Sequence, residues 1–323
     1  MLDVEGAPWA KPLPWRQFPM QMFLEQLING LTLGSFYALV AIGYSMVYGV
    51  MKLINFAHGD LFTLGSYLGY TILVIGAGWV TRTFGIWGGL AVATLGAMLG
   101  VGIAGLILER VAYAPVYKAG RLPLVVSALG ASIFLANGIM AVWGPRFQAY
   151  PMTSIPTGSI LLFGDFRISI LKLVTLLVSL GLMALIYFVV ERTTFGAAIR
   201  ASALDRETAT IVGIDFRKII LFVFFVGPAL GALAGVFAGL NYTRIIFTLG
   251  WGYGLKAFTA VILGGIGNIP GALLGGLLLG VIEALFEGFV SGAWKNVFVF
   301  LILIIILIVR PTGLIGEKVA EKV

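Results

Sequence analysis

One run of polar residues interrupts an otherwise apolar part of the chain, Asn55-Phe56-Ala57-His58-Gly59-Asp60. The amide of Asn55 and the imidazole of His58 can hydrogen-bond a polar solute, so the run could be a broken helix that lines a path through the protein. The same residue types are typical of a capped turn between two helices, where a lone histidine is satisfied locally. Both interpretations stay open from the sequence.

A glycine-rich run, Gly264-Gly265-Ile266-Gly267-Asn268-Ile269-Pro270-Gly271, is the second candidate. Where a membrane helix is broken, its unpaired backbone groups can bind a carboxylate or an amine. We therefore take Gly264, Gly265 and Asn268, together with Asn55 and His58, as candidate residues of a translocation pathway.

Three ionisable residues flank this glycine-rich run: Lys256, Glu283 and Glu287. Such groups are functional candidates when they face a cavity inside a membrane. We favour the alternative, in which they mark the ends of a helical hairpin and their side chains reach the membrane surface.

Most other chemistry is excluded by residue counts. The chain has one histidine and no cysteine, which excludes disulfides, thiol catalysis and metal sites made of several histidines or cysteines. We therefore predict no catalytic residue, no metal site and no enzyme activity. The phosphate-binding pattern G-x-x-x-x-G-K-[ST] is absent, so any ATP hydrolysis would occur on another polypeptide.

The composition indicates a membrane protein. Of 323 residues, 60% are hydrophobic and 11% are charged, with a mean hydropathy of +1.04. Soluble globular chains carry roughly 25% charged residues, so this chain cannot cover a water-facing surface. A soluble enzyme, a nucleic-acid-binding protein and a disordered protein are excluded, and the net charge of +7 reflects Lys and Arg at the cytoplasmic ends of membrane spans.

The apolar stretches are long enough to cross a bilayer, which takes about 20 residues per helix. They are Gln26–Met51, Leu61–Thr81, Thr83–Leu108, Leu122–Pro145, Leu173–Val190, Ile219–Thr243, Ala257–Ile282 and the shorter Asn296–Val309. Open sheets cannot satisfy their backbone in lipid. We predict an all-α, polytopic helical membrane protein with about eight transmembrane segments and a re-entrant or broken-helix hairpin.

Basic residues in short loops predict the orientation. The loop around Arg110 and Lys118, the loop 191–218 and the tail after Arg310 are all expected in the cytoplasm. Residues 244–295 must then cross inward and return, while the side of the N-terminus stays open. We divide the chain into an extension 1–21 that we expect to be disordered, a permease domain 22–316 and a tail 317–323.

Glycines recur at four-residue spacing, as helices that pack backbone to backbone in lipid require. The longest such row is Gly227, Gly231, Gly235 and Gly239. Shorter rows are Gly267, Gly271 and Gly275, then Gly30 with Gly34, and Gly96 with Gly100. We favour ordinary helix packing for these rows over a sliding interface or a partner interface.

The loop 191–218 carries nine of the 35 charged residues. Alanine-rich residues 197–203 predict a short helix. Asp205 is placed to cap a second one, Gly213 to end it, and Asp215 to cap the following span. A connector needs only a few residues, so we favour an element that docks a soluble partner.

The order of residues in this loop is distinctive as a set: Arg200-Ala201, Ala203, Asp205, Ala209 and Gly213-Ile214. Other matching stretches are Asn29-Gly30 through Gly49, Asn55-Phe56-Ala57-His58-Gly59, Leu263-Gly264-Gly265, Pro270-Gly271 and Arg310-Pro311-Thr312-Gly313-Leu314. Together they resemble the LivH-type permease subunits of branched-chain amino-acid ABC importers, over about residues 22–316.

This resemblance implies a permease of the bacterial cytoplasmic (inner) membrane, with no cofactor of its own. Its partners would be a homologous second permease, two ATPase subunits and a periplasmic substrate-binding protein. The ATPase subunits would use ATP and dock on residues 191–218, the cytoplasmic coupling segment. Arg200, Asp205, Ala209 and Gly213 would form the ATPase coupling surface.

Other functions remain possible at this point. Related permeases carry urea or short amides, and the apolar lining does not distinguish these substrates from branched-chain amino acids. An ion-coupled secondary transporter is less favoured, because the central spans have few charged groups for an ion relay.

Overall fold

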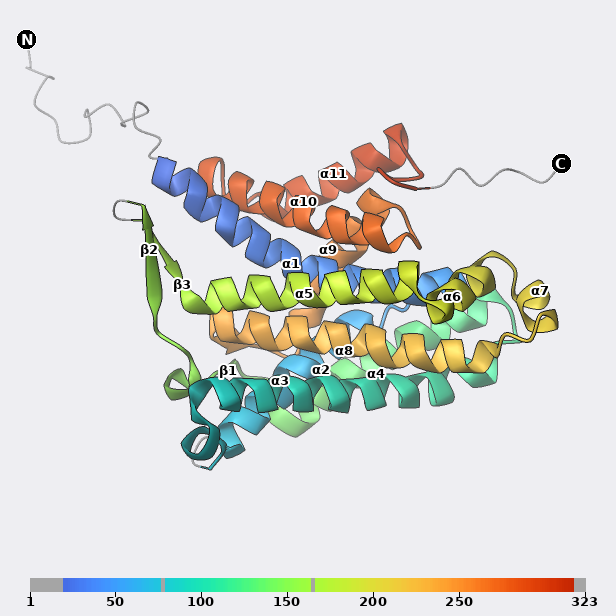
Figure 1. Ribbon diagram of the computed structural model, residues 1–323, viewed down its shortest axis with the longest axis horizontal. Coiled ribbons are helices and arrows are strands. Elements are labelled where there is room, and N and C mark those ends of the chain that lie inside the picture. Colours follow the sequence, from blue (N-terminus) through green and yellow to red (C-terminus); the bar gives the residue numbers. More distant parts are fainter. Residues whose placement is uncertain (1–19, 77–78, 164–165, 317–323) are drawn as a thin grey trace, which may run out of the picture.

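The computed structural model describes residues 20–76, 79–163 and 166–316. The expected disordered extension therefore lies outside the described residues except for Met20 and Gln21, which begin the first helix. The tail 317–323 also lies outside them. Figure 1 shows a bundle of long helices with small β-structures at one end and two short helices at the other.

The long helices reproduce the predicted apolar stretches with shifted ends. They are α1 (Met20–Met51), α2 (His58–Gly76), α3 (Val80–Leu108), α4 (Arg121–Trp143), α5 (Ile170–Arg192), α8 (Phe216–Tyr242), α9 (Leu249–Gly264), α10 (Ile269–Phe289) and α11 (Lys295–Val309). The expected single stretch Ala257–Ile282 is in fact parts of two helices, α9 and α10.

The remaining elements are short. They are η1 (Glu109–Tyr113), η2 (Ala114–Val116), η3 (Met152–Ser154), α6 (Thr194–Leu204), α7 (Arg206–Ile211), β1 (Gln148–Ala149), β2 (Ser159–Phe163), β3 (Phe166–Ser169) and β4 (Arg244–Ile245). β1 pairs with β4, and β2 pairs with β3, both antiparallel.

Six helical stretches of the described chain are long and apolar enough to span a membrane. They are α1, α3 with its continuation to Val116, α4, α5, α8 and α10, with α11 as a shorter apolar helix. α2 has 19 residues and α9 has 16, and neither belongs to this set. The helical membrane fold is confirmed, whereas the count of eight spans is not.

The helices α1 and α8 form the centre of the bundle. The most apolar window of α1 is 94% buried and that of α8 is 72% buried, against 22% for α4 and 28% for α5. Close backbone approach explains this burial, since a side chain at Gly34 would collide with the backbone of α10 at Gly276 and Leu277. The outer helices expose their apolar residues, as lipid-facing helices do.

The two basic loops lie at one end of the bundle, which we call the cytoplasmic end after the orientation that the sequence predicts. Arg206 of α7 lies over the Tyr117 ring at 4.8 Å, so the two basic loops lie at the same end. Figure 1 shows α6 and α7 at this end, and the β2–β3 hairpin and the start of α1 at the opposite end. In the predicted orientation, with the basic loops in the cytoplasm, the start of α1 lies at the opposite, outer end. The sequence had left this side open.

One expectation about charged residues is wrong. Lys256 and Glu283 do not mark the ends of a hairpin, because they form a buried ion pair between α9 and α10, with 2.5 Å between Nζ and Oε1. Glu283 is only 1% exposed and also accepts a hydrogen bond from the Tyr37 hydroxyl at 2.9 Å. Glu287 does lie at a helix end, where it pairs with Lys295 of α11.

Candidate functional site

Asn55 and His58 lie in a segment that re-enters the protein after α1. The α1 helix ends at Met51, and Lys52 adopts the left-handed conformation with φ of 52°. The chain then runs inward, so that Asn55 and His58 are both fully buried when α2 begins. The polar run is therefore inside the helical bundle, not in a solvent-exposed turn.

Asn55 holds this segment in place. Its Oδ1 accepts hydrogen bonds from the Ala57 backbone N–H at 3.1 Å and from the Tyr113 hydroxyl at 2.6 Å. Among the described residues, Asn55 Nδ2 has no hydrogen-bond partner. The His58 ring lies near the Val40 carbonyl, but without good hydrogen-bond geometry. Because buried polar groups are nearly always satisfied, Asn55 Nδ2 has capacity for a solute or a water molecule. The hydrogen bond from the Ala57 N–H to Asn55 is typical of a capped turn, whereas the buried position of the segment is what a broken helix along a path would have.

The ring of His58 packs where three helices meet. It lies against Tyr44 of α1, with 4.8 Å between ring centroids. A side chain at Gly43 would collide with the His58 ring, and Gly227 of α8 lies beside both. The glycines thus make room for an imidazole at the centre of the bundle.

The glycine row of α8 faces these same elements. Gly231 lies near His58 and the Phe62 backbone, and Gly235 contacts the backbone of α2 at Phe62. Gly239 packs on the Tyr150 ring near the outer end. The row therefore lets α8 lie directly against α1 and α2. Every glycine of the row packs against another part of the same chain.

A small cavity lies beside the start of α2, and Asp60 is a lining residue that the sequence did not single out. The cavity has a volume of about 110 Å³ and lies between α1, α2, α4 and α9. Asp60 and Tyr44 contribute polar groups to its lining, which is otherwise apolar or glycine. From the sequence, Asp60 was interpreted only as a helix cap. Its position at the end of the polar run was the one available signal.

The glycine-rich run forms the turn between α9 and α10. Gly265 and Gly267 take positive φ values of 112° and 85°, which end α9. Asn268 then caps α10, since its Oδ1 accepts from the Gly271 N–H at 2.7 Å, while its Nδ2 donates to the Ile315 carbonyl at 3.2 Å.

This turn is separate from the cavity beside Asp60. The backbone N–H of Leu314 donates to the Leu263 carbonyl and that of Ile315 donates to the Gly264 carbonyl, so the C-terminal segment covers the turn. Gly267 lies against Tyr48 and Gly49 near the cytoplasmic end of α1. Gly264, Gly265 and Asn268 are thus placed at the cytoplasmic end, and they do not line the cavity beside Asp60.

The coupling segment has the local structure that its sequence predicts. Asp205 caps α7 by accepting hydrogen bonds from the N–H groups of Glu207 and Thr208 at 2.9 and 3.2 Å. Gly213, with φ of 89°, follows the last turn of α7. Asp215 caps α8, and the N–H groups of Lys218 and Arg217 lower the pKa of its carboxyl.

Two other coupling residues face inward. Arg200 donates to the Val190 carbonyl at the end of α5 and lies 3.6 Å from Glu191. Ala209 is 3% exposed, and its carbonyl accepts the Ile214 N–H at 3.0 Å. Arg200 therefore ties the segment to the end of α5, whereas Ala209 is buried and closes the turn after α7.

The outward surface of this segment carries three aliphatic side chains among exposed charged and polar ones. Leu204 is 85% exposed, Ile211 is 84% exposed and Val212 is 69% exposed. Leu204 and Ile211 are the last residues of α6 and α7, which Figure 1 shows at one end of the bundle. Sequence reasoning missed them, because aliphatic residues are unremarkable in so apolar a chain. Exposed apolar clusters on an aqueous surface mark protein interaction sites.

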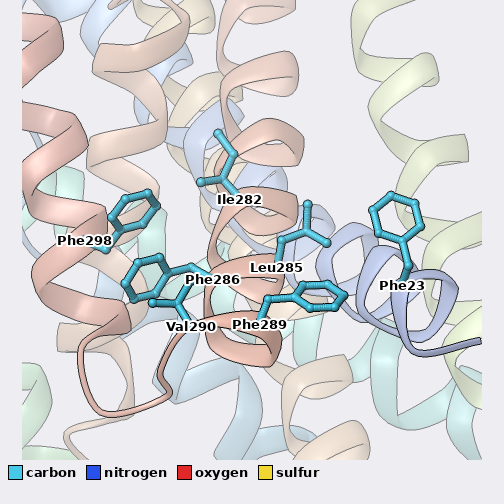
Figure 2. A pocket seen from close by; sticks show the side chains of 7 residues that line it. All are labelled: Phe23, Ile282, Leu285, Phe286, Phe289, Val290 and Phe298. Carbon is cyan, nitrogen blue, oxygen red and sulfur yellow. The ribbon is translucent and has the colours of Figure 1, made fainter. Parts of the chain in front are cut away.

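Another pocket lies at the outer end of the bundle and offers no polar chemistry. Figure 2 shows its side chains gathered around the end of α10, with Phe23 from α1 and Phe298 from α11. Its volume is about 440 Å³ and every lining residue is apolar. The rings of Phe286 and Phe298 stack there with centroids 4.1 Å apart. Such a surface suits lipid or helix contact.

Comparison with known proteins shows which protein family this sequence matches. Residues 26–307 match the protein family described as "Branched-chain amino acid transport system / permease component". The chain is 40% identical over 310 residues to the high-affinity branched-chain amino acid transport system permease protein LivH of Escherichia coli strain K12, covering 93% of this chain and 98% of that protein. It is 39% identical over 306 residues to BraD of Pseudomonas aeruginosa, with the same coverage.

A more distant relative is named for a different solute. The autoinducer 2 import system permease protein LsrC of Escherichia coli O9:H4 is 28% identical over 187 residues, which is 55% of this chain and 52% of that protein. Sequence similarity thus extends to a permease that is named for another solute.

Proposed function

Because this chain belongs to the family of permease components of branched-chain amino acid transport systems, we propose that it forms the translocation path of an ATP-driven importer for branched-chain, hydrophobic amino acids. The observation that carries the ATP-driven part is the aliphatic surface of Leu204, Ile211 and Val212. In the proposed orientation this surface faces the cytoplasm, and the caps at Asp205 and Asp215 support the helices that carry and follow it.

The proposed partners follow from this surface and from the relatives. Two ATPase subunits bind ATP and dock on the coupling segments of this chain and of a homologous second permease. A periplasmic binding protein delivers the amino acid at the outer end. This chain contributes no nucleotide-binding motif, so the cofactor ATP is used by the partners.

The four predicted coupling residues have different parts in this proposal. Asp205 and Gly213 fix the two ends of α7, which sets the angle at which the aliphatic side chains meet the ATPase. Arg200 ties the segment to the end of α5, and Ala209 closes the turn after α7. The segment therefore moves as one body with the helices to which it is bonded.

Movement of the segment can reach the centre of the bundle through α8. Asp215 joins the segment directly to the first turn of α8. The glycine row of α8 lies against α1 and α2, with Gly227 and Gly231 beside His58. A small shift of α8 would therefore displace His58 and the start of α2, where the pathway residues Asn55 and His58 lie. The Gly264, Gly265 and Asn268 turn would line the cytoplasmic mouth.

The test is ATP-driven uptake by the complete complex reconstituted in liposomes. Replacing Ile211 by Asp places a charge on the docking surface, and Gly213→Pro changes the end of α7. We expect both to reduce ATPase association and uptake together, at least about tenfold for a charge forced into an apolar contact. Thr210→Ala, which removes a hydroxyl bonded only within α7, is the matched control. Normal uptake in both variants would contradict the docking role.

A further inference from the structure

The cavity beside the start of α2 has one charged residue in its lining. Asp60 lies on α2, and the other walls come from Tyr44 of α1, Phe56 of the re-entrant segment, and Gly250, Trp251 and Phe258 of α9. Trp251 is 64% exposed, so the cavity opens to the surface of this chain on that side. Its volume of about 110 Å³ is several times what one water molecule needs.

The Asp60 carboxylate lacks a cationic partner. It is 6% exposed and accepts a hydrogen bond from the Ser132 hydroxyl of α4 at 2.5 Å. Within residues 20–76, 79–163 and 166–316, Asp60 forms no salt bridge. A carboxylate taken out of water is costly unless a positive charge compensates it. Its place in the first turn of α2 supplies only part of that compensation.

Another buried acid shows what full compensation looks like in this protein. Glu283 is sealed between Lys256 and Tyr37, with both carboxylate oxygens bonded. Glu283 is not among the residues that line the cavity beside Asp60. Asp60 differs in both respects, since a cation is missing and a cavity is present.

The cavity-lining residues other than Asp60 indicate what kind of small molecule the cavity could hold. The rings of Tyr44, Phe56 and Phe258 offer apolar surface, and aromatic faces also attract a cation. Gly59, Gly250 and Gly254 also line the cavity, and their lack of side chains lets α2 and α9 lie backbone to backbone beside it. The cavity therefore suits a small solute with one ammonium group and an aliphatic part.

We propose that the Asp60 carboxylate binds the α-ammonium group of the transported amino acid, whose aliphatic side chain lies against Tyr44, Phe56 and Phe258. This inference rests on the proposed function and names a recognition site within it. The movement of α8 described above would open or close this site, because Tyr44 packs on His58.

The experiment compares Asp60→Asn with wild type in liposomes that hold the complete complex, with leucine as the probe. Asparagine keeps the shape of the side chain and an oxygen for the Ser132 hydroxyl, so a merely structural role of Asp60 would survive. We expect the saturated rate of leucine uptake to fall at least about tenfold, as loss of a charge-assisted hydrogen bond does. ATPase stimulation by the loaded binding protein should stay within about twofold, because the docking surface is unchanged. Asp60→Glu should restore part of the uptake.

Two controls distinguish an ammonium site from a general effect of charge and from a sodium site. Glu287→Gln removes a charge from α10 at an exposed ion pair and should leave uptake unchanged. Replacing sodium by choline in the wild-type assay should also change nothing, because the proposed cation is the substrate.

The possible outcomes distinguish failure of the proposed function from failure of the ammonium site alone. No ATP-driven uptake by the wild-type complex would overturn the proposed function itself. Wild-type uptake with an equally active Asp60→Asn variant would overturn only the ammonium site. Sodium-dependent uptake that becomes sodium-independent in Asp60→Asn would overturn it as well, by assigning an inorganic cation to the cavity.

Discussion

Two buried acids of this protein, Asp60 and Glu283, lie in opposite kinds of surroundings. Glu283 has a cation at 2.5 Å and a tyrosine hydroxyl at 2.9 Å, and its side chain is almost fully buried. Asp60 has a serine hydroxyl, no salt bridge among the residues that the structure describes and a cavity open on one side. A buried charge that is fully paired stabilises an arrangement of helices, whereas one left without a counter-charge has capacity for a ligand.

The largest effect is expected when the Lys256–Glu283 ion pair is broken. Lys256→Met leaves the Glu283 carboxylate buried without its cation, so we expect the free energy of unfolding to fall by about 3–5 kcal/mol. Thermal unfolding of the detergent-purified protein measures this loss. A variant as stable as wild type but without uptake would show that Lys256 serves transport and would reverse the comparison.

The next effect concerns the second bond to Glu283. Tyr37→Phe removes the hydroxyl that donates to Oε2, in a site where Tyr37 is 2% exposed and water cannot replace it. We expect a loss of about 1.5–3 kcal/mol, the range for hydrogen bonds to charged groups. The same unfolding measurement applies, with uptake per folded molecule unchanged. Tyr70→Phe is the control, because its hydroxyl bonds Gln148 in a partly buried site.

Removing both members of the ion pair should cost less than removing Lys256 alone. In Lys256→Met/Glu283→Leu no buried charge remains at this site, so the remaining loss of stability should be about 1–3 kcal/mol, from the Tyr37 hydroxyl that loses its acceptor. Unfolding of the two single variants and the double variant forms a double-mutant cycle. A double variant as unstable as the single ones would mean that the pair itself specifies the helix arrangement.

The long helices and several helix caps could be predicted from the sequence, whereas the surroundings of Asp60 and Glu283 could not. Apolar length located the long helices, and the caps at Asp205 and Asp215 follow from local hydrogen bonding that needs no tertiary contact. The break between α9 and α10 was signalled by Gly265, Gly267 and Asn268. In each case the residues that decide the structure are neighbours in sequence.

The candidate sites depend on contacts between distant residues, which residue spacing does not encode. Lys256 and Glu283 are 27 positions apart, and Tyr37 is 246 positions from Glu283. Ser132 is 72 positions from Asp60. From the sequence, all of these looked like end markers, caps or ordinary polar residues. Only the packing of α1, α4, α9 and α10 shows which charge is paired.

The smallest expected effect compares the two acids through the same chemical change. Ser132→Ala removes one hydroxyl that donates to Asp60, as Tyr37→Phe removes one that donates to Glu283. Because the Asp60 carboxylate lines a cavity, water can take the place of the serine hydroxyl, and the loss of stability should be no more than about 1 kcal/mol. Uptake should remain within a few fold, since the carboxylate that binds the ammonium group is still present. Ser132→Thr, which keeps the hydroxyl, is the matched control. Equal losses of stability in Ser132→Ala and Tyr37→Phe would mean that both sites are equally closed to water, and the distinction between a sealed acid and an available one would not hold.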